Sequence, residues 1–351
     1  MITYNQYTVN DLRDWIEKGA NNGLSEHIVS LSRANALLHC PCAKDGDVLV
    51  VSAMDGDVVV GYTAIFPEHL VRPDMWIATG TTLWVNPDYA DDFVGYNLVQ
   101  RLWQSYPQYA VIGSDVSPTA AVIDKLLGAK VVKYERKVFV FRRRIAIHSL
   151  RNLGSWLMEP LRQCRQRQAL ANVLASIPSD IHVAARNVVD AEVYEFIRSH
   201  STNDTFLRSC EMLNWMLRYP FSAENPLANH AVKRMAFSDQ IAAYSNHLLS
   251  VYQDRTLVGV VMLAVRNSNM EVKMLYTDDQ YRESVYALIV ETMVHSSAQQ
   301  LVSIYPQLNA YLQSHHVALR TNSSELIFTY PKADKHFSPL VLQGADGDMF
   351  A

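Results

Sequence analysis

A chain of 351 residues is too long for one ordinary hydrophobic core and has the length of two domains of roughly 150 residues each. Hydrophobic residues make up 49% of the sequence and charged residues 19%, a composition that is typical of globular proteins and excludes the disordered, collagenous and fibrous classes. The formal net charge is −4, so nucleic acid is not the expected partner.

The spacing of the cysteines and the length of the apolar runs indicate the cellular compartment in which the protein is expected. The four cysteines (Cys40, Cys42, Cys164 and Cys210) are too unevenly spaced for a disulfide framework, so free thiols are expected. The residues after Met1 lack the regions of a signal peptide, and no apolar run approaches the roughly 18 residues that cross a bilayer. We therefore expect a cytoplasmic protein with no membrane partner, and the composition indicates no particular oligomeric state.

The first part of the chain alternates helical and strand patterns. Apolar residues at helical spacing predict two opening helices, and β-branched runs on either side of Asp55-Gly56-Asp57 predict a hairpin that Pro67 and Pro73 close. The predicted elements are, in order, helices at 9–19 and about 24–38, strands at 48–53, 58–66 and 76–85, a helix at about 93–106, a strand at 109–113, a helix at about 119–127 and a strand at 131–141.

An arginine-rich stretch follows, and it predicts a helix at about 156–176 that ends before Pro178. Its arginines are Arg142, Arg143, Arg144, Arg151, Arg162, Arg165 and Arg167. They make either a solvated or domain-docking face, which is the ordinary role of a charge run, or a site for an anionic substrate or RNA.

The second part repeats the order of the first. It predicts helices at 191–200 and 204–218, strands at 248–253, 257–265 and 271–276, a helix at 282–295, a strand at 301–305, a helix at 308–314 and strands at 326–330 and 340–342. Helices, hairpins and a mixed sheet in this order indicate the α+β class and not a doubly wound repeat. We expect two related domains at 1–144 and 181–351, joined by the helical linker 145–180.

One segment carries a specific resemblance. From Ser117 to Ala129 the sequence reads SPTAAVIDKLLGA, which is similar to a segment that commonly reads NxxAxxLYxKLGF in the GCN5-related N-acetyltransferase (GNAT) family. Ser117 stands where that segment has Asn, Asp124 where it has Tyr, and Ala129 where it has Phe. The resemblance implies a tandem pair of GNAT-like domains, each a largely antiparallel sheet flanked by helices, with acetyl-CoA or another acyl-CoA as co-substrate.

The resemblance also implies the residues that would hold the acyl-CoA. They are Leu83, Trp84 and Val85 for the pantetheine arm, Gly95, Tyr96 and Asn97 at a helix start for the pyrophosphate, and Ser117. In the family a glycine-rich loop presents bare N–H groups to the pyrophosphate. Here the loop reads ADDFVG, so only Gly95 survives, and Asp91 and Asp92 put negative charge near the expected diphosphate. The same carboxylates equally suit a helix start that binds nothing.

Catalysis in this family needs a base for the amine and an acid for the leaving thiolate. The candidates are Tyr134 as the acid, and Glu68, His69 and Asp115 as bases; a packed aromatic ring or solvated loop residues are the alternatives. Asp124 is expected to be a surface residue of its helix. Thr79, Thr81 and Thr82 are expected to alternate across the strand that contains them.

No metal site is expected. His39, Cys40 and Cys42 bring metal-binding residue types together, but no second pair follows at a suitable spacing, so packed thiols at a helix end explain them. In the second half the stretch 276–284, equivalent to the pyrophosphate loop, has no glycine, which predicts a domain without cofactor.

The sequence therefore favours an enzyme that transfers an acyl group, most simply acetyl, from CoA to an amine of a small molecule. One alternative is a catalytically inactive GNAT-fold scaffold or binding protein, which the altered loop would suit. Another is a Fem-type aminoacyl transfer enzyme whose arginine cluster would bind tRNA.

Overall fold

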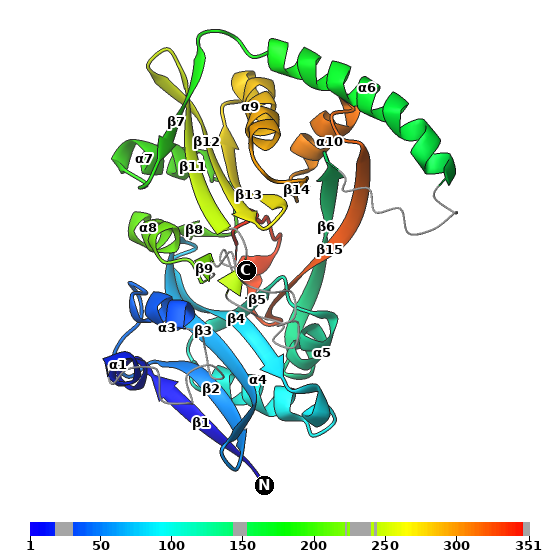
Figure 1. Ribbon diagram of the computed structural model, residues 1–351. Coiled ribbons are helices and arrows are strands. Elements are labelled where there is room, and N and C mark those ends of the chain that lie inside the picture. Colours follow the sequence, from blue (N-terminus) through cyan, green and yellow to red (C-terminus); the bar gives the residue numbers. More distant parts are fainter. Residues whose placement is uncertain (18–30, 143–152, 222, 225–239, 242–243, 347–351) are drawn as a thin grey trace. The chain divides into compact units, whose positions relative to one another are not determined.

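A computed structural model describes residues 1–17, 31–142, 153–221, 223–224, 240–241 and 244–346 (Figure 1). The chain divides into two compact units, and each unit takes segments from both halves of the sequence. Unit 1 consists of Met1–Tyr134, Asn203–Ala242 and Leu326–Ala351, and unit 2 of Glu135–Thr202 and Ala243–Glu325. The contiguous boundaries at 1–144, 145–180 and 181–351 stay a prediction. Two strands, β6 (Ala129–Val140) and β15 (Arg320–Pro331), begin in one unit and end in the other.

The sheet of unit 1 is mainly antiparallel. Its strands, in spatial order, are β1 (Ile2–Thr8), β2 (Val48–Asp55), β3 (Val58–Arg72), β4 (Met75–Val85), β5 (Ala110–Ser114) and the end of β15. Neighbours are antiparallel except β4 and β5, which are parallel. The short strand β8 (Leu207–Arg208) pairs with β3, and β9 (Ala223–Glu224) pairs with β10 (Gln240–Ile241).

Helices cover both faces of this sheet. They are α1 (Val9–Glu17), α3 (Leu31–Leu38), α4 (Val94–Gln104), α5 (Pro118–Leu126) and α8 (Cys210–Arg218). Ile65 belongs to the apolar cluster beneath α4, whereas its neighbour Phe66 packs on Trp215 of α8 with ring centroids 5.2 Å apart. Successive residues of a strand point to opposite faces, so α4 and α8 lie on opposite faces of the sheet.

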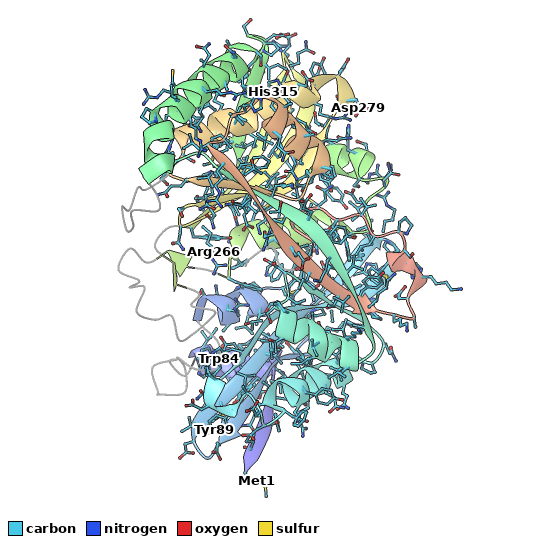
Figure 2. The ribbon with its side chains drawn as sticks, turned by 90° about the vertical axis from the view of Figure 1, so that its right-hand side faces the viewer. Met1, Trp84, Tyr89, Arg266, Asp279 and His315 are labelled. Carbon is cyan, nitrogen blue, oxygen red and sulfur yellow. The ribbon has the colours of Figure 1, made fainter. Side chains whose placement is uncertain are left out.

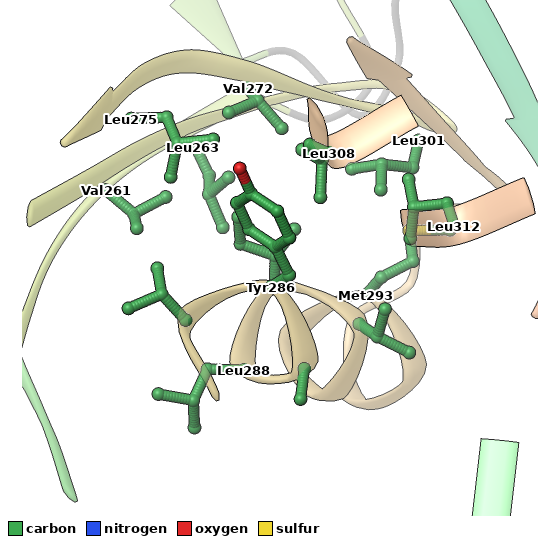
Figure 3. Close-up of a cluster of buried hydrophobic side chains, with 14 of the residues drawn as sticks. Val261, Leu263, Val272, Leu275, Tyr286, Leu288, Met293, Leu301, Leu308 and Leu312 are labelled. Atoms are coloured by element: carbon green, nitrogen blue, oxygen red, sulfur yellow. The ribbon is translucent and has the colours of Figure 1, made fainter. Parts of the chain in front are cut away.

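Unit 2 is built on the same plan. Its strands are the first part of β15, the end of β6, β14 (Gln300–Ser303), β13 (Asn269–Thr277), β12 (Thr256–Arg266), β11 (Tyr244–Gln253) and β7 (Ile181–Arg186). The helices are α6 (Leu153–Ala175), α7 (Ala191–His200), α9 (Arg282–His295) and α10 (Pro306–Ser314). Figure 3 shows Tyr286 of α9 extending toward Leu263 of β12 and Val272 of β13, within the apolar core of this unit.

The observed architecture confirms the α+β class with a mixed, mostly antiparallel sheet. Several element predictions are corrected. Strand β3 runs through Pro67 and ends at Arg72, directly before Pro73, so the prediction is wrong for Pro67. The helix expected from 204 begins at Cys210 behind the Ser209 cap, because residues 207–208 pair with β3 instead. The run 340–342 is not a strand, and of the helix expected at 24–38 the residues before 31 lie outside the described ranges.

Two further features bear on the sequence predictions. In the part of the chain that the structure describes, no helix is both long enough and apolar enough to cross a membrane. All four cysteines lie in described residues, and none of them is in a disulfide.

Candidate active site

A cleft opens in unit 1 where the parallel strands β4 and β5 part. They pair from Ile77 with Ala110 to Gly80 with Gly113, and β4 then continues to Val85 without β5, still paired with β3. The cavity between them has a volume of about 110 Å³. It is lined by residues of β3, β4, α4, β5, α5 and the loop between β5 and α5, namely Thr63, Ile65, Gly80, Thr81, Thr82, Leu83, Val99, Leu102, Trp103, Val111, Ile112, Gly113, Ser114, Asp115, Val116, Ser117, Ala120 and Asp124.

A β-bulge shapes the β4 wall of this cleft. Ala64 pairs with Thr82 and Ile65 with Gly80, so Thr81 is the extra residue. The bulge interrupts the two-residue alternation, and both Thr81 and Thr82 line the cleft. The expected alternation of the three threonines is therefore wrong at this point.

Buried donors already occupy the carbonyl groups at the bulge. Arg33 of α3 donates from Nη1 to the Thr81 carbonyl at 3.3 Å and to Thr81 Oγ1 at 3.0 Å. Thr63 Oγ1 donates to the Thr82 carbonyl at 2.7 Å. Arg33, Thr63 and Thr81 are all buried, so these bonds hold the parted end of β4 in place.

Asp124 is the buried carboxyl group in the cleft wall. It is 7% exposed, and Thr329 of β15 donates from Oγ1 to Asp124 Oδ2 at 2.7 Å. Burial raises its pKa to about 6, against the lowering effect of the Thr329 hydrogen bond. The prediction of a surface residue is thus wrong, because α5 turns this position toward β5 and β15.

Gly113 provides the room for this pair. A Cβ at Gly113 would lie 2.7 Å from Thr329 Oγ1, 2.8 Å from Val116 Cγ1 and 3.5 Å from Asp124 Oδ2. A side chain there would displace the atoms that hold the Asp124 carboxyl.

In the turn between β4 and α4, a residue other than glycine has the left-handed backbone conformation that glycine usually adopts. Phe93, 73% exposed, has φ 55° in the left-handed region and precedes the first turn of α4 without a side-chain cap. The first intrahelical bond runs from Asn97 N to the Phe93 carbonyl at 3.0 Å, so the amides of residues 94–96 precede the helical ladder. Asp91 and Asp92 are exposed beside them.

The predicted acyl-CoA residues separate into two groups. Leu83 and Ser117 line the cleft, and Ser117 also caps α5 by accepting from Ala120 N at 3.1 Å. Trp84 and Val85 continue β4 beyond the lining; Trp84, labelled in Figure 2, has its ring centroid 5.8 Å from that of Tyr62.

The remaining three lie in the first turn of α4. Gly95 is held between two elements, because a Cβ there would lie 3.1 Å from Ile123 Cδ1 and 3.4 Å from Val85 Cγ2. Tyr96 and Asn97 follow it and are half-buried. Their proposed contacts with the cofactor stay predictions.

Of the predicted catalytic residues, the structure brings Asp115 to the cleft, where it has φ 47° and is exposed. Within the described residues the lining does not include Glu68, His69 or Tyr134. His69 contacts Asp74 at 2.9 Å, and the Tyr134 hydroxyl donates to the Leu340 carbonyl at 3.0 Å. Burial raises the pKa of Tyr134. The catalytic roles of all four stay predictions.

Glu68 is fully buried in a cluster of charged groups. Arg208 of β8 donates to both of its carboxylate oxygens, at 2.7 and 3.2 Å, and Thr79 Oγ1 donates to Oε1 at 2.9 Å. Arg208 also donates to Asp346 at 2.9 Å. These bonds join β3, β4, β8 and Asp346. They indicate that Glu68 stabilises the fold of unit 1.

The equivalent strand in unit 2 has a bulge of its own. Met262 pairs with Met274 and Leu263 with Val272, so Lys273 is the extra residue of β13. The Tyr305 hydroxyl donates to the Lys273 carbonyl at 3.1 Å. The carbonyl of the bulge residue in unit 2 thus accepts a hydrogen bond from a side chain, as the carbonyl of Thr81 does in unit 1. Among the described side chains, no group of three His, Cys, Asp or Glu could hold a metal ion.

The comparisons with known proteins agree with this architecture. No family model matches the sequence, and no curated protein does so either. Among solved structures, a tandem GNAT protein from the clavulanic acid biosynthesis pathway matches with a TM-score of 0.51 at 10% identity, over 94% of this chain and 98% of that one. This chain has a tandem GNAT fold.

Two further structures with this fold are similar to the chain. A GCN5-related N-acetyltransferase from Kribbella flavida has a TM-score of 0.50 at 13% identity, over 93% of this chain and 71% of its own. The corresponding protein from Anabaena variabilis has a TM-score of 0.50 at 10% identity, over 94% and 72%. Asp124 lies on α5, the helix after β5, and the sequence alone missed its burial. The signal that could have found it is the amphipathic spacing of Ala121 and Asp124 on one face of α5.

Proposed function

We propose that unit 1 transfers an acyl group, most simply acetyl, from a CoA thioester to the amine of a small molecule. The observation that carries this proposal is the buried Asp124 carboxyl in the wall of the cleft between the diverging ends of β4 and β5. The GNAT fold supports it at the level of architecture.

The residues present fit the two parts of an acyl-CoA unequally. The cleft offers apolar walls from Leu83, Val99 and Leu102, which suit a pantetheine arm. The amides of residues 94–96 precede the helical ladder of α4 and are the kind of donor that a pyrophosphate needs, but Asp91 and Asp92 oppose a diphosphate. We therefore expect weak binding of the nucleotide part.

Asp124 is the proposed proton donor to the leaving sulfur. The amine nitrogen attacks the thioester carbonyl carbon; the C–N bond forms, the C–S bond breaks and the amine proton passes to water. The thiolate takes the proton of the Asp124 carboxyl, which water then replaces. A ligand that fills the cleft excludes water from this carboxyl, and desolvation raises its pKa further above its value of about 6 in the free protein.

Binding of acyl-CoA is the first expected result. A ligand at about 100 times its dissociation constant stabilises the folded state by about 2.7 kcal/mol, so excess acetyl-CoA should raise the melting temperature. Differential scanning fluorimetry with acetyl-, propionyl- and longer acyl-CoA measures this. The absence of any shift would reject the proposal and favour the scaffold alternative, which the two aspartates suit; the Fem-type alternative stays an untested prediction.

The aspartates of the turn provide the second expected result. The double variant Asp91→Asn, Asp92→Asn removes negative charge beside the α4 start, so acyl-CoA should bind about fivefold to tenfold more tightly at low salt. Titration calorimetry at low and high ionic strength measures this, because screening reduces the difference. The variant Asp88→Asn, in the same turn but before the helix start, is the control. Equal affinity of the double variant and the wild type at low salt would show that the pyrophosphate lies elsewhere.

A further inference from the structure

The hydroxyl group of Thr82 is an unusual feature of the cleft. Thr82 is 8% exposed and lines the cavity, and its Oγ1 is buried with no hydrogen-bond partner among the described residues. A buried hydroxyl without a partner costs free energy of folding, and such groups are rare in native proteins. A ligand that enters the cleft would give this hydroxyl a hydrogen-bond partner.

The neighbouring carbonyl groups already have hydrogen-bond donors. The carbonyl of Thr81 accepts from Arg33, and the carbonyl of Thr82 accepts from Thr63. Thr81 Oγ1 is also taken by Arg33. At the point where β4 leaves β5, these groups each have a partner, whereas the buried Thr82 hydroxyl has none among the described residues.

The apolar side chains around Thr82 in the cleft indicate which kind of hydrogen-bond partner its hydroxyl would bind. Leu83, Ile65 and Val111 are apolar neighbours in the cleft lining, and a neutral hydroxyl among apolar side chains pairs best with a neutral acceptor. We propose that Thr82 is a binding residue whose hydroxyl donates to a carbonyl oxygen of the acyl donor, either the thioester carbonyl or a pantetheine amide. This inference rests on the proposed function.

The test compares two threonines, one whose hydroxyl has no partner among the described residues and one whose hydroxyl donates a hydrogen bond. Thr82→Val keeps the shape of the side chain and removes the hydroxyl, and Thr63→Val does the same to a hydroxyl that has a partner, at 2.7 Å from the Thr82 carbonyl. Without ligand, we expect Thr82→Val to unfold at the same or a higher temperature than the wild type, and Thr63→Val at a lower one. A fall in the Thr82→Val melting temperature would assign its hydroxyl a structural role and overturn the inference.

The second readout is binding. Thr82→Val should bind acetyl-CoA about fivefold to tenfold more weakly, the loss of one hydrogen bond, and Thr82→Ser should restore the affinity. Weaker binding of acetyl-CoA alone identifies the thioester carbonyl, and equal weakening with free CoA identifies a pantetheine amide. Adenosine 3′,5′-bisphosphate, which has neither carbonyl, should bind both proteins equally.

The outcomes separate the two proposals. If acetyl-CoA binds the wild type and Thr82→Val with one affinity, or if the bisphosphate is weakened as much as acetyl-CoA, the inference about Thr82 is wrong while the proposed function stands. If the wild type binds no acyl-CoA at all, the proposed function fails and the inference fails with it.

Discussion

Asp124→Asn should abolish most of the acyl transfer and at the same time make the protein more stable at alkaline pH. A proton donor at the leaving group contributes typically 10²-fold to 10⁴-fold to a rate, so we expect kcat to fall by about a hundredfold or more. Binding of acyl-CoA should change little, because the amide keeps the shape of the carboxyl and can accept the Thr329 hydrogen bond. Steady-state kinetics together with the thermal shift measure the two effects separately.

The gain in stability follows from the raised pKa. In the folded state the pKa of Asp124 is about 6, above its ordinary value of 3.8, so the fold favours the protonated form. The Asp124 carboxyl therefore lowers the stability of the wild type as pH rises from about 4 through about 6, and its own contribution to this loss is about 3 kcal/mol. The neutral amide avoids this loss. The variant should match the wild type near pH 4 and exceed it by that order above pH 6.

Denaturant unfolding at acidic and alkaline pH checks this difference. Asp115→Asn is the control, since that carboxyl lines the same cleft but is exposed. A stability difference between Asp124→Asn and the wild type that does not vary with pH would show that the carboxyl is not held in its neutral form. Unchanged kcat would remove Asp124 from the proposed mechanism.

Glu68→Ala should destabilise unit 1 by about 3 to 5 kcal/mol, which is the cost of removing one partner of a buried ion pair. Glu68 is fully buried and bonded to Arg208 at 2.7 Å, and its loss leaves a buried guanidinium with Asp346 as the remaining carboxylate partner in the described cluster. Chemical denaturation followed by tryptophan fluorescence measures the change.

The variant Glu68→Gln separates this structural role from the predicted catalytic one. The amide oxygen can still accept from Thr79 or Arg208, so a structural role predicts a smaller loss of stability and near-normal kcat for the protein that remains folded. A hundredfold loss of kcat in a stable Glu68→Gln protein would instead support the prediction of a catalytic base.

Local patterns in the sequence were sufficient for much of the secondary structure. The helix expected at 282–295 is found at Arg282–His295, and the hairpin around Asp55-Gly56-Asp57 forms with Gly56 at φ 60°, the backbone that such a turn needs. The segment from Ser117 forms the predicted helix α5 with Ser117 as its cap. These features depend on residues that are close in the chain, so their physical causes are visible in the sequence.

The exceptions depend on distant partners. Strands β1 and β7 were missed: β1 is exposed along part of its length, and an alternating pattern as short as that of β7 is weak without its partner. Pro67 lies inside β3 and not at its end, because the pairing with β4 continues on both sides of it. Residues 207–208, which were expected to belong to a helix that begins at residue 204, pair with β3 instead.

The sequence by itself predicted a tandem GNAT-like architecture of the α+β class, and it showed that the turn before α4 carries acidic residues in place of glycines. Periodicity, turn residues and charge are local properties, and each of these conclusions follows from them. Only the tertiary structure decided which side chains meet. Thr329, near the far end of the chain, donates to Asp124 and buries it, and Thr63 and Arg33 occupy the carbonyls beside Thr82. Burial and hydrogen bonding set the pKa of a carboxyl and the unused capacity of a hydroxyl, and both arise from contacts between residues far apart in sequence.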